Sequence, residues 1–214
     1  MMLRIDKKLW GRFVEMVGPT NWGNISVLDN SSILIKPSGY VFNKNKNPLL
    51  ISPLHSNLKP SVDLPIHQEI YKANKEIKSI VHTHSDYATA FAQARKEITV
   101  YGTTHADFFC KSIPLTKKLS LSEIKKSYEL NTGLQIKRLL EDDPSLPGCL
   151  VSGHGVFAWG KNPNEAIKNS LIIEKIAKLN YLTLIINKEL VPLEKELIKK
   201  HYDRKNGKFK YYGQ

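Results

Sequence analysis

A pair of histidines at the end of an apolar segment is the feature that most restricts how this chain folds. Ile80 and Val81 run directly into the segment His82-Thr83-His84. β-Branched residues favour a strand, and side chains two positions apart on a strand lie on the same face. We therefore expect both imidazoles to point to one side of a sheet, at its rim. Zinc binds neutral imidazole nitrogens at about 2.0–2.1 Å, so such a pair is typical of a metal site.

A third ligand is expected far along the chain, at His154. This histidine stands between two glycines and follows the apolar run Cys149–Val151, and glycines let the backbone come close to whatever the histidine touches. A single histidine is more often solvated or hydrogen-bonded than a ligand, which is the simpler interpretation of His55 and His105. For the three together, the spacing favours a divalent metal with an open coordination position, as in catalytic zinc sites.

Length and composition indicate one globular domain spanning residues 1–214. The chain is 41% hydrophobic and 24% charged, which is ordinary for a protein with one well-formed core. No apolar run approaches the ~18 residues of a membrane span, and the charged segment Arg4–Lys8 occupies the place of a signal peptide's apolar core. We therefore expect a cytoplasmic protein. Cys110 and Cys149 are too few for a disulfide framework and are expected to be reduced thiols.

The net charge of +12 restricts the partners less than it first suggests. A basic protein can bind nucleic acid, an acidic membrane surface or small phosphorylated molecules. Lysines are scattered over the whole chain, however, with denser runs only at Lys117-Lys118, Lys125-Lys126 and Lys199–Lys210. Scattered lysines usually form a solvated surface, so we expect neither a nucleic acid nor a membrane partner.

Periodicity and end signals predict helices and strands along the whole chain, without internal repeats. Helices are expected where apolar residues recur every three to four positions, and strands where they alternate or run together between turn residues. The expected helices are Asp6–Val17, 64–73, Tyr87–Arg95, Ser120–Leu140, Asn162–Ile186 and Leu193–Tyr202, and the expected strands are Asn24–Leu28, Ser32–Lys36, 80–84, Ile98–Tyr101, Cys149–Val151 and Val156–Trp159.

Two polar loops flank the hairpin formed by the first two expected strands. They are Asn21–Asn24 before it and Lys36–Gly39 after it, and antiparallel pairing brings them to the same end. Backbone N–H groups freed by glycine, the hydroxyl of Ser38, an asparagine amide and a lysine ammonium together suit a phosphate group. Two ordinary turns would have the same composition, and the sequence pattern leaves both interpretations open.

Three further features permit more than one role. Asp63 directly precedes a helix with Pro65 in its first turn, so it is either an N-cap or a group facing the metal. His105 and Asp107 stand two residues apart beside aromatic residues and form either a proton-transfer pair or a turn cap. The basic, aromatic tail 203–214 could be a disordered arm, a nucleic-acid clamp or a segment laid on a neighbouring subunit.

The motifs taken in order resemble those of the class II aldolase/adducin family over nearly the whole chain. Within it, the chain is most similar to the L-ribulose-5-phosphate 4-epimerase branch. This similarity rests on Gly102–Asp107 and on two C-terminal segments, His201-Tyr202 and Tyr211–Gln214. The motifs that carry the resemblance are Gly23-Asn24-Ile25-Ser26, Lys36-Pro37-Ser38-Gly39, Pro60-Ser61-Val62-Asp63, His82-Thr83-His84, Gly102–Asp107 and His154–Lys161.

The resemblance implies an α/β fold, namely a three-layer α/β/α domain with a central, mostly antiparallel sheet. It also implies a ring-shaped homotetramer with active sites between adjacent subunits. One Zn2+ per subunit would be held by His82, His84 and His154, with Asp63 beside them. Asp107 and Tyr212 would be the acid/base pair, with Tyr212 reaching in on the tail of a neighbouring chain. The residues expected to bind substrate, chiefly its phosphate, are Gly23, Asn24, Lys36, Ser38, Gly39 and Ser61.

The implied reaction interconverts L-ribulose 5-phosphate and D-xylulose 5-phosphate. The inverted carbon, C4, bears a hydroxyl but no acidic proton, so the C3–C4 bond must be broken and remade. A metal Lewis acid suits the negative charge that this cleavage develops. The alternative is an aldolase of the same fold, which releases dihydroxyacetone phosphate and an aldehyde. Asp63, where related aldolases carry glutamate, favours the epimerase; a non-catalytic module like the adducin head would lack the three histidines.

Overall fold

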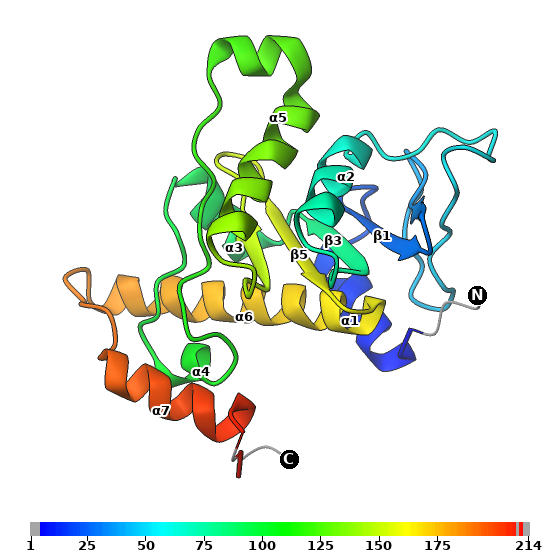
Figure 1. Ribbon diagram of the computed structural model, residues 1–214. Coiled ribbons are helices and arrows are strands. Elements are labelled where there is room, and N and C mark those ends of the chain that lie inside the picture. The colour runs from blue at the N-terminus through cyan, green and yellow to red at the C-terminus, as the bar shows by residue number, and fades with distance from the viewer. Residues whose placement is uncertain (1–4, 209, 212–214) are drawn as a thin grey trace.

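The central sheet has five strands in the described part of the chain, in the order β2-β1-β3-β5-β4. The structure, a computed structural model, describes residues 5–208, 210 and 211. Every neighbouring pair of strands is antiparallel (Figure 1), which confirms the expected central sheet. The strands are β1 (Asn24–Asp29), β2 (Ser32–Ile35), β3 (Ser79–Thr83), β4 (Gly148–Leu150) and β5 (Val156–Gly160).

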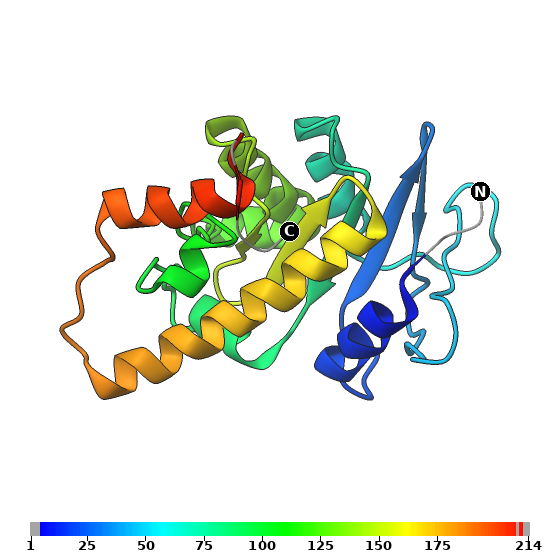
Figure 2. The same cartoon turned by 90° about the horizontal axis from the view of Figure 1, so that it is seen from below.

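Helices cover both faces of the sheet and complete three α/β/α layers. The helices α2 and α5 pack on one face, and α1, α3 and α6 pack on the other (Figure 2). The helices α4 and α7 contact each other beside these layers. The helices are α1 (Lys7–Val17), α2 (Leu64–Ala73), α3 (Asp86–Gln93), α4 (Thr103–Ala106), α5 (Leu121–Asp142), α6 (Pro163–Ile186) and α7 (Lys195–Asn206).

The central strand β3 supplies apolar side chains to both helical layers. Ile80 packs in the cluster with α2 and α5, whereas Val81 packs in the cluster with α1 and α6. Both are fully buried, because successive side chains of a strand point to opposite faces of the sheet. His82 stands two positions after Ile80, so it faces the layer of α2 and α5.

Three helices begin at the expected residues, where a side chain caps the first turn. The Asp6 carboxylate accepts a hydrogen bond from the backbone N–H of Leu9, and Ser120 and Glu123 form a capping box at the start of α5. The side chain of Asn162 caps α6 in the same way. Each such cap satisfies helix N–H groups that have no partner in the first turn, and contributes about 1 kcal/mol.

Two of the sequence predictions about secondary structure are wrong in detail. Residues 98–101 are not a strand, since only Ile98 pairs there, in an isolated bridge with Ile113. Ile98 and Val100 are nevertheless buried, so their apolar pattern reflects packing against helices instead of sheet pairing. The last helix starts at Lys195 and continues to Asn206, so the segment 203–206 of the expected tail is helical.

The cysteines agree with the prediction of reduced thiols. Cys149 is buried and Cys110 is half-buried, and neither forms a disulfide within the described residues. None of the helices in the described residues is both long enough and apolar enough to cross a membrane.

Candidate metal centre

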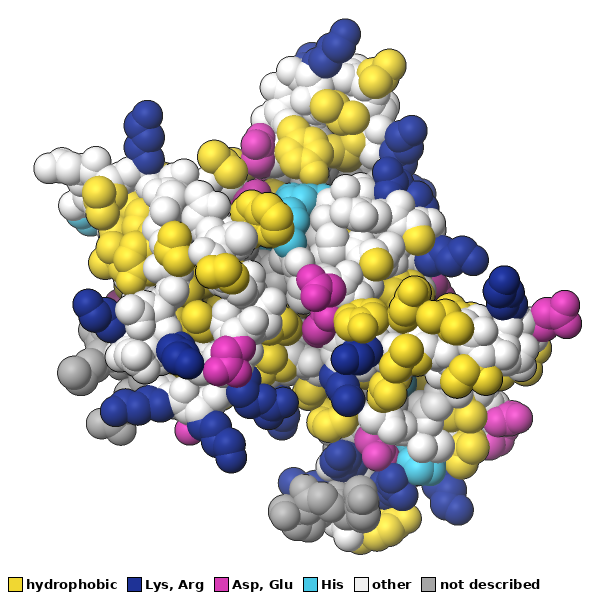
Figure 3. Space-filling model, turned by 180° about the vertical axis from the view of Figure 1, so that it is seen from behind, with side chains coloured by type: hydrophobic (Ala, Val, Ile, Leu, Met, Phe, Trp, Pro, Cys, Tyr) yellow, Lys and Arg dark blue, Asp and Glu magenta, His cyan; other side chains and the backbone are white. Residues whose placement is uncertain are grey.

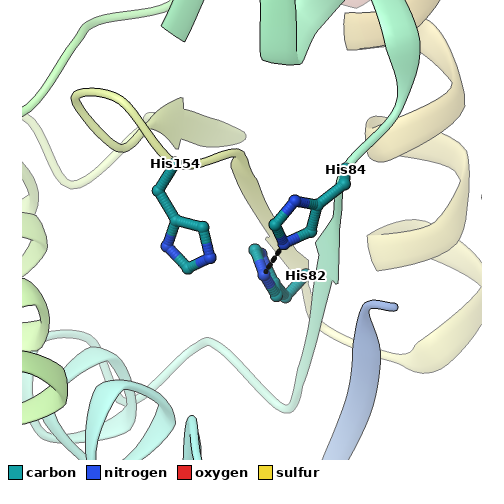
Figure 4. Close-up of side chains that lie close together, drawn as sticks. All are labelled: His82, His84 and His154. Atoms are coloured by element: carbon teal, nitrogen blue, oxygen red, sulfur yellow. Dashed lines mark hydrogen bonds between the residues drawn. The ribbon is translucent and has the colours of Figure 1, made fainter. Parts of the chain in front are cut away.

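The three histidines singled out in the sequence meet at one point. His82 lies on β3, His84 follows that strand by one residue, and His154 lies in the loop between β4 and β5 (Figure 4). One ring nitrogen of each lies within 4.8 Å of the others, and the Nε2 atoms of His82 and His84 are 3.0 Å apart. Two nitrogens bound to one tetrahedral zinc lie roughly 3.3 Å apart. The number, chemistry and spacing of these donors therefore fit a zinc ion.

Two glycines allow the chain to approach His82 closely. A Cβ atom on Gly155 would lie 2.7 Å from the Thr83 carbonyl oxygen and 3.2 Å from Cε1 of His82. Gly23 has a φ of +74°, and a Cβ there would lie 2.6 Å from the His82 carbonyl oxygen. Any larger residue would push these segments away from β3. This role was predicted for the glycines beside His154 and is confirmed for Gly155.

Hydrogen bonds at Nδ1 orient two of the imidazoles. Nδ1 of His82 donates to the Val156 carbonyl oxygen across 2.9 Å, and the ring stacks on Phe157 with centroids 4.3 Å apart. Nδ1 of His154 lies 3.2 Å from the Tyr128 hydroxyl. With Nδ1 occupied, Nε2 keeps its lone pair for a metal, which is the usual arrangement of ligating histidines.

The environment keeps the three imidazoles neutral. Burial lowers the pKa of His82 well below its ordinary value, and the neighbouring His154 and His84 lower it further. Burial also lowers the pKa values of His84 and His154, and proximity to Asp63 opposes the shift in both. Neutral imidazole is the form that binds metal, so these histidines are in the ligand form at neutral pH.

Asp63 faces the histidines and does not cap a helix with its side chain. It occupies the N-cap position of α2, but its carboxylate makes no capping hydrogen bond in the described structure. Instead, Oδ2 accepts a 2.6 Å hydrogen bond from Nδ2 of Asn24 and lies 3.9 Å from Nε2 of His82. The interpretation of Asp63 as an N-cap is therefore wrong for the side chain, and a carboxylate lies beside the metal site.

The two loops expected to bind phosphate lie together, and the segment 59–61 joins them. The Ser38 N–H donates to the Lys59 carbonyl, and the Ser61 N–H donates to the Lys36 carbonyl. The Lys36 ammonium is buried and donates to the carbonyl oxygens of Asn21 and Tyr40 at 3.1 and 2.7 Å. Lys36 therefore clamps one loop to the other, and burial lowers the pKa of its ammonium.

The expected substrate residues on these loops continue directly into the metal site. Nδ2 of Asn24 contacts the Ser61 hydroxyl at 3.1 Å as well as Asp63. Gly23 touches the backbone of His82, and Gly39 has the positive φ that favours glycine. Binding of a phosphate by these residues stays a prediction.

The predicted acid/base residue Asp107 lies outside the histidine cluster of its own chain. It follows α4, and its carboxylate accepts hydrogen bonds from Arg204 and His201 of α7 at 2.9–3.1 Å. His105 instead contacts the Lys111 carbonyl, and burial lowers its pKa to about 4. The two do not form a proton-transfer pair in the described contacts. Tyr212, the other predicted acid/base residue, lies outside the described residues.

The site is open to solvent on one side. Histidine side chains reach the surface below the projecting start of α5, next to hydrophobic side chains (Figure 3). The Trp22 ring is 60% exposed, and its centroid is 6.1 Å from that of His84. Both line a hollow of about 470 Å3. Trp22 and Tyr128 were not predicted as residues of the site, although Trp22 directly precedes a motif glycine.

A layered α/β domain with three convergent imidazoles at the end of an antiparallel strand defines a metal-binding class of protein. The chain belongs to the class II aldolase family: residues 15–181 match the model of the "Class II Aldolase and Adducin N-terminal domain". This confirms the fold and family that the motifs indicated.

Solved structures agree with this assignment at the level of the fold. An L-fuculose 1-phosphate aldolase is 21% identical, with a TM-score of 0.71 and 92% of each chain covered. A second L-fuculose 1-phosphate aldolase, from Glaciozyma antarctica PI12, is 16% identical, with a TM-score of 0.69 over 92% of this chain and 80% of the other. A sugar-phosphate aldolase from Thermotoga maritima is 24% identical, with a TM-score of 0.61 over 85% and 94%.

Proposed function

We propose that this protein is a zinc-dependent epimerase that interconverts L-ribulose 5-phosphate and D-xylulose 5-phosphate by breaking and remaking the C3–C4 bond. The observation that carries the proposal is the cluster of three neutral imidazoles with the Asp63 carboxylate 3.9 Å from His82. Membership of the class II aldolase family supports an aldolase- or epimerase-like function on a sugar phosphate. The choice of the epimerase rests on Asp63 and on the motifs around Asp107 and Tyr212.

The residues of the chain have separate tasks in this proposal. His82, His84 and His154 hold the zinc, which supplies Lewis acidity for the negative charge that develops on substrate oxygens during cleavage. Asp63, held by Asn24, adds a negative charge beside the ligands. The loops around Ser38 and Ser61 hold the phosphate and keep the aldehyde fragment in place until it is attacked again.

The acid/base residues are proposed to come from a second subunit. Asp107 is bound to Arg204 and His201 on α7, and the N–H of Tyr211 donates to the Arg204 carbonyl. Asp107 thus lies with the last described residues of the chain, outside the histidine cluster of the same chain. A ring-shaped homotetramer in which Asp107 and Tyr212 of one subunit serve the zinc of its neighbour reconciles the motifs with this arrangement.

The alternative function is a class II aldolase. The solved structures with a similar fold include L-fuculose 1-phosphate aldolases and a sugar-phosphate aldolase, and this observation favours the alternative. An aldolase releases both fragments. An epimerase must instead retain the aldehyde while the aldehyde rotates and presents its opposite face to the nucleophile. The two functions therefore differ in their products and can be separated by one assay.

The assay incubates purified zinc-loaded protein with L-ribulose 5-phosphate, with and without a chelator. Formation of D-xylulose 5-phosphate that stops with the chelator and returns with added zinc is the expected result. Stoichiometric release of dihydroxyacetone and glycolaldehyde phosphate would contradict the epimerase. Cleavage of L-fuculose 1-phosphate to dihydroxyacetone phosphate and lactaldehyde, offered in parallel, would establish the aldolase alternative.

The shared active site has its own test in the Tyr212→Phe variant. Loss of a general acid or base slows turnover about 10²- to 10⁴-fold, while the bound zinc is expected to stay unchanged. Coexpression of Tyr212→Phe with His82→Ala subunits is expected to restore part of the activity, because mixed interfaces then contain one intact site. Absence of any restored activity in confirmed mixed oligomers would contradict a site made by two subunits.

A further inference from the structure

A break in helix α5 directs one aromatic side chain toward the metal site. Ser127 interrupts the helix with φ −168° and ψ 79°, and the next residue, Tyr128, is half-buried. The side chain of Asn131 donates to the Glu123 carbonyl across 2.9 Å, so a carbonyl at the break gains a partner. The projecting first turn of α5 (Figure 1) therefore changes direction just before Tyr128.

The hydroxyl of Tyr128 contacts a histidine that lies in a loop, where no strand holds it. His82 lies within a strand, bonds to Val156 and stacks on Phe157. His154 instead lies in a loop beside Gly153, whose φ is +78°. Its Nδ1 atom is 3.2 Å from the Tyr128 hydroxyl, and the two ring centroids are 6.1 Å apart.

We infer that Tyr128 is a positioning residue for His154: its hydroxyl accepts a hydrogen bond from Nδ1–H and so holds Nε2 toward the metal. This inference rests on the proposed zinc site and adds to it a residue that contacts a ligand of the metal instead of the metal itself. The same arrangement holds His82, where the acceptor is a backbone carbonyl. Loss of such an acceptor typically weakens metal binding 10- to 100-fold, because the ring orientation and the tautomer are no longer held.

The test measures metal binding directly on the full-length protein stripped of metal. Zinc affinity is measured by competition with a chromophoric chelator, and the coordination geometry by the visible absorption of bound Co2+. Tyr128→Phe keeps the ring and removes only the hydroxyl, and we expect its dissociation constant for zinc to rise 10- to 100-fold with an altered Co2+ spectrum. The matched control is Tyr181→Phe, since this tyrosine on α6 is 46% exposed, and it is expected to bind metal like the wild type.

Each outcome has one meaning. Wild-type zinc affinity and an unchanged Co2+ spectrum in Tyr128→Phe would overturn the role of Tyr128 and leave the zinc site intact. Absence of a stoichiometric zinc site in the wild type would overturn the proposed function itself. The metal-induced rise in Tm, taken for each variant against its own metal-free form, keeps the comparison valid if Tyr128→Phe is less stable.

Discussion

Nδ2 of Asn24 and Oδ2 of Asp63 lie 2.6 Å apart, although 39 positions separate them in the chain. Asn24 begins β1 and stands opposite His82 in the antiparallel pairing with β3, so the sheet register brings the amide to the edge of the metal site. The amide is only 2% exposed. A buried hydrogen bond to a charged group is stronger than one between neutral groups, and it holds the carboxylate toward His82.

Neutralising Asp63 is expected to weaken zinc binding. In Asp63→Asn the negative charge 3.9 Å from His82 disappears while the size of the side chain is kept. We expect zinc affinity to fall about 10- to 100-fold, and kcat/KM of the proposed reaction to fall with it. Chelator competition and steady-state kinetics measure the two effects. The control is Asp142→Asn at an exposed position, and equal zinc affinity in wild type and Asp63→Asn would refute the prediction.

Enlarging Gly155 is expected to disturb both stability and metal binding. The added Cβ would meet the Thr83 carbonyl at 2.7 Å and the His82 ring at 3.2 Å, so the loop carrying His154 must move. Overpacking of this kind typically costs about 1–3 kcal/mol. Urea unfolding and zinc titration of Gly155→Ala measure both effects.

The matched control for this change is Gly11→Ala. Gly11 lies within α1 with no atom near the position of an added Cβ, and alanine in a helix is about 0.5–1 kcal/mol more favourable than glycine. We therefore expect a slight gain in stability and unchanged zinc binding. If both glycine variants behaved alike, the close approach at Gly155 would have no bearing on the metal site.

His67 is expected to make stability fall as the pH is lowered. Its Nδ1 atom is 2.7 Å from the Ser26 hydroxyl, and burial lowers its pKa to about 3. Between about pH 3 and 6.5 the unfolded chain therefore binds a proton that the folded protein does not, and the free energy of unfolding rises with pH. Each pH unit corresponds to about 1.4 kcal/mol, which gives about 2 kcal/mol between pH 7 and pH 5.

Urea unfolding of metal-free protein at these two pH values measures the total pH dependence, and the difference between the wild type and His67→Gln gives the contribution of His67. His67→Gln keeps a polar partner for Ser26 but cannot titrate, so its unfolding free energy should depend less on pH than that of the wild type. The exposed His55 serves as the control, and His55→Gln should keep the wild-type pH dependence. An identical pH dependence in all three proteins would show that His67 is not buried in its neutral form.

Lys36 is expected to hold the two hairpin loops together as well as to face the phosphate. In Lys36→Met the carbonyls of Asn21 and Tyr40 lose their donor, which costs about 1–3 kcal/mol for buried groups. We expect a lower Tm and a higher KM for the sugar phosphate. Lys188→Met, at an exposed position, is the control. A lower Tm with an unchanged KM would assign Lys36 to the loops alone.

The sequence predicted the elements of this protein that depend on near neighbours. The capping residues Asp6, Ser120 and Asn162 mark helix starts because the hydrogen bonds they make lie within the first turn. The pair His82 and His84 was recognisable for the same reason, since the two-residue period of a strand sets the direction of both side chains. Segment 98–101 was misassigned because burial against helices and pairing in a sheet produce the same apolar pattern.

The contacts across the chain could not be predicted in this way. The bond from Asn24 to Asp63 depends on the register of β1 against β3 and on the position of α2, and the contact of Tyr128 with His154 depends on the break at Ser127. Neither residue pair has a distinctive spacing. Asp63 is an example: its place before a helix suggested that its side chain caps that helix. Its carboxylate instead accepts a hydrogen bond from Asn24, a strand residue distant in the sequence.

The sequence by itself thus determined the kinds of ligand, their local geometry and the family, because these follow from residue types and spacings within a few positions. The tertiary structure confirmed that His154 meets His82 and His84, and it alone decided that Asn24 holds Asp63 and that Tyr128 lies beside His154. The physical reason is that strand pairing and close packing bring these residues together, and both are cooperative properties of the whole domain.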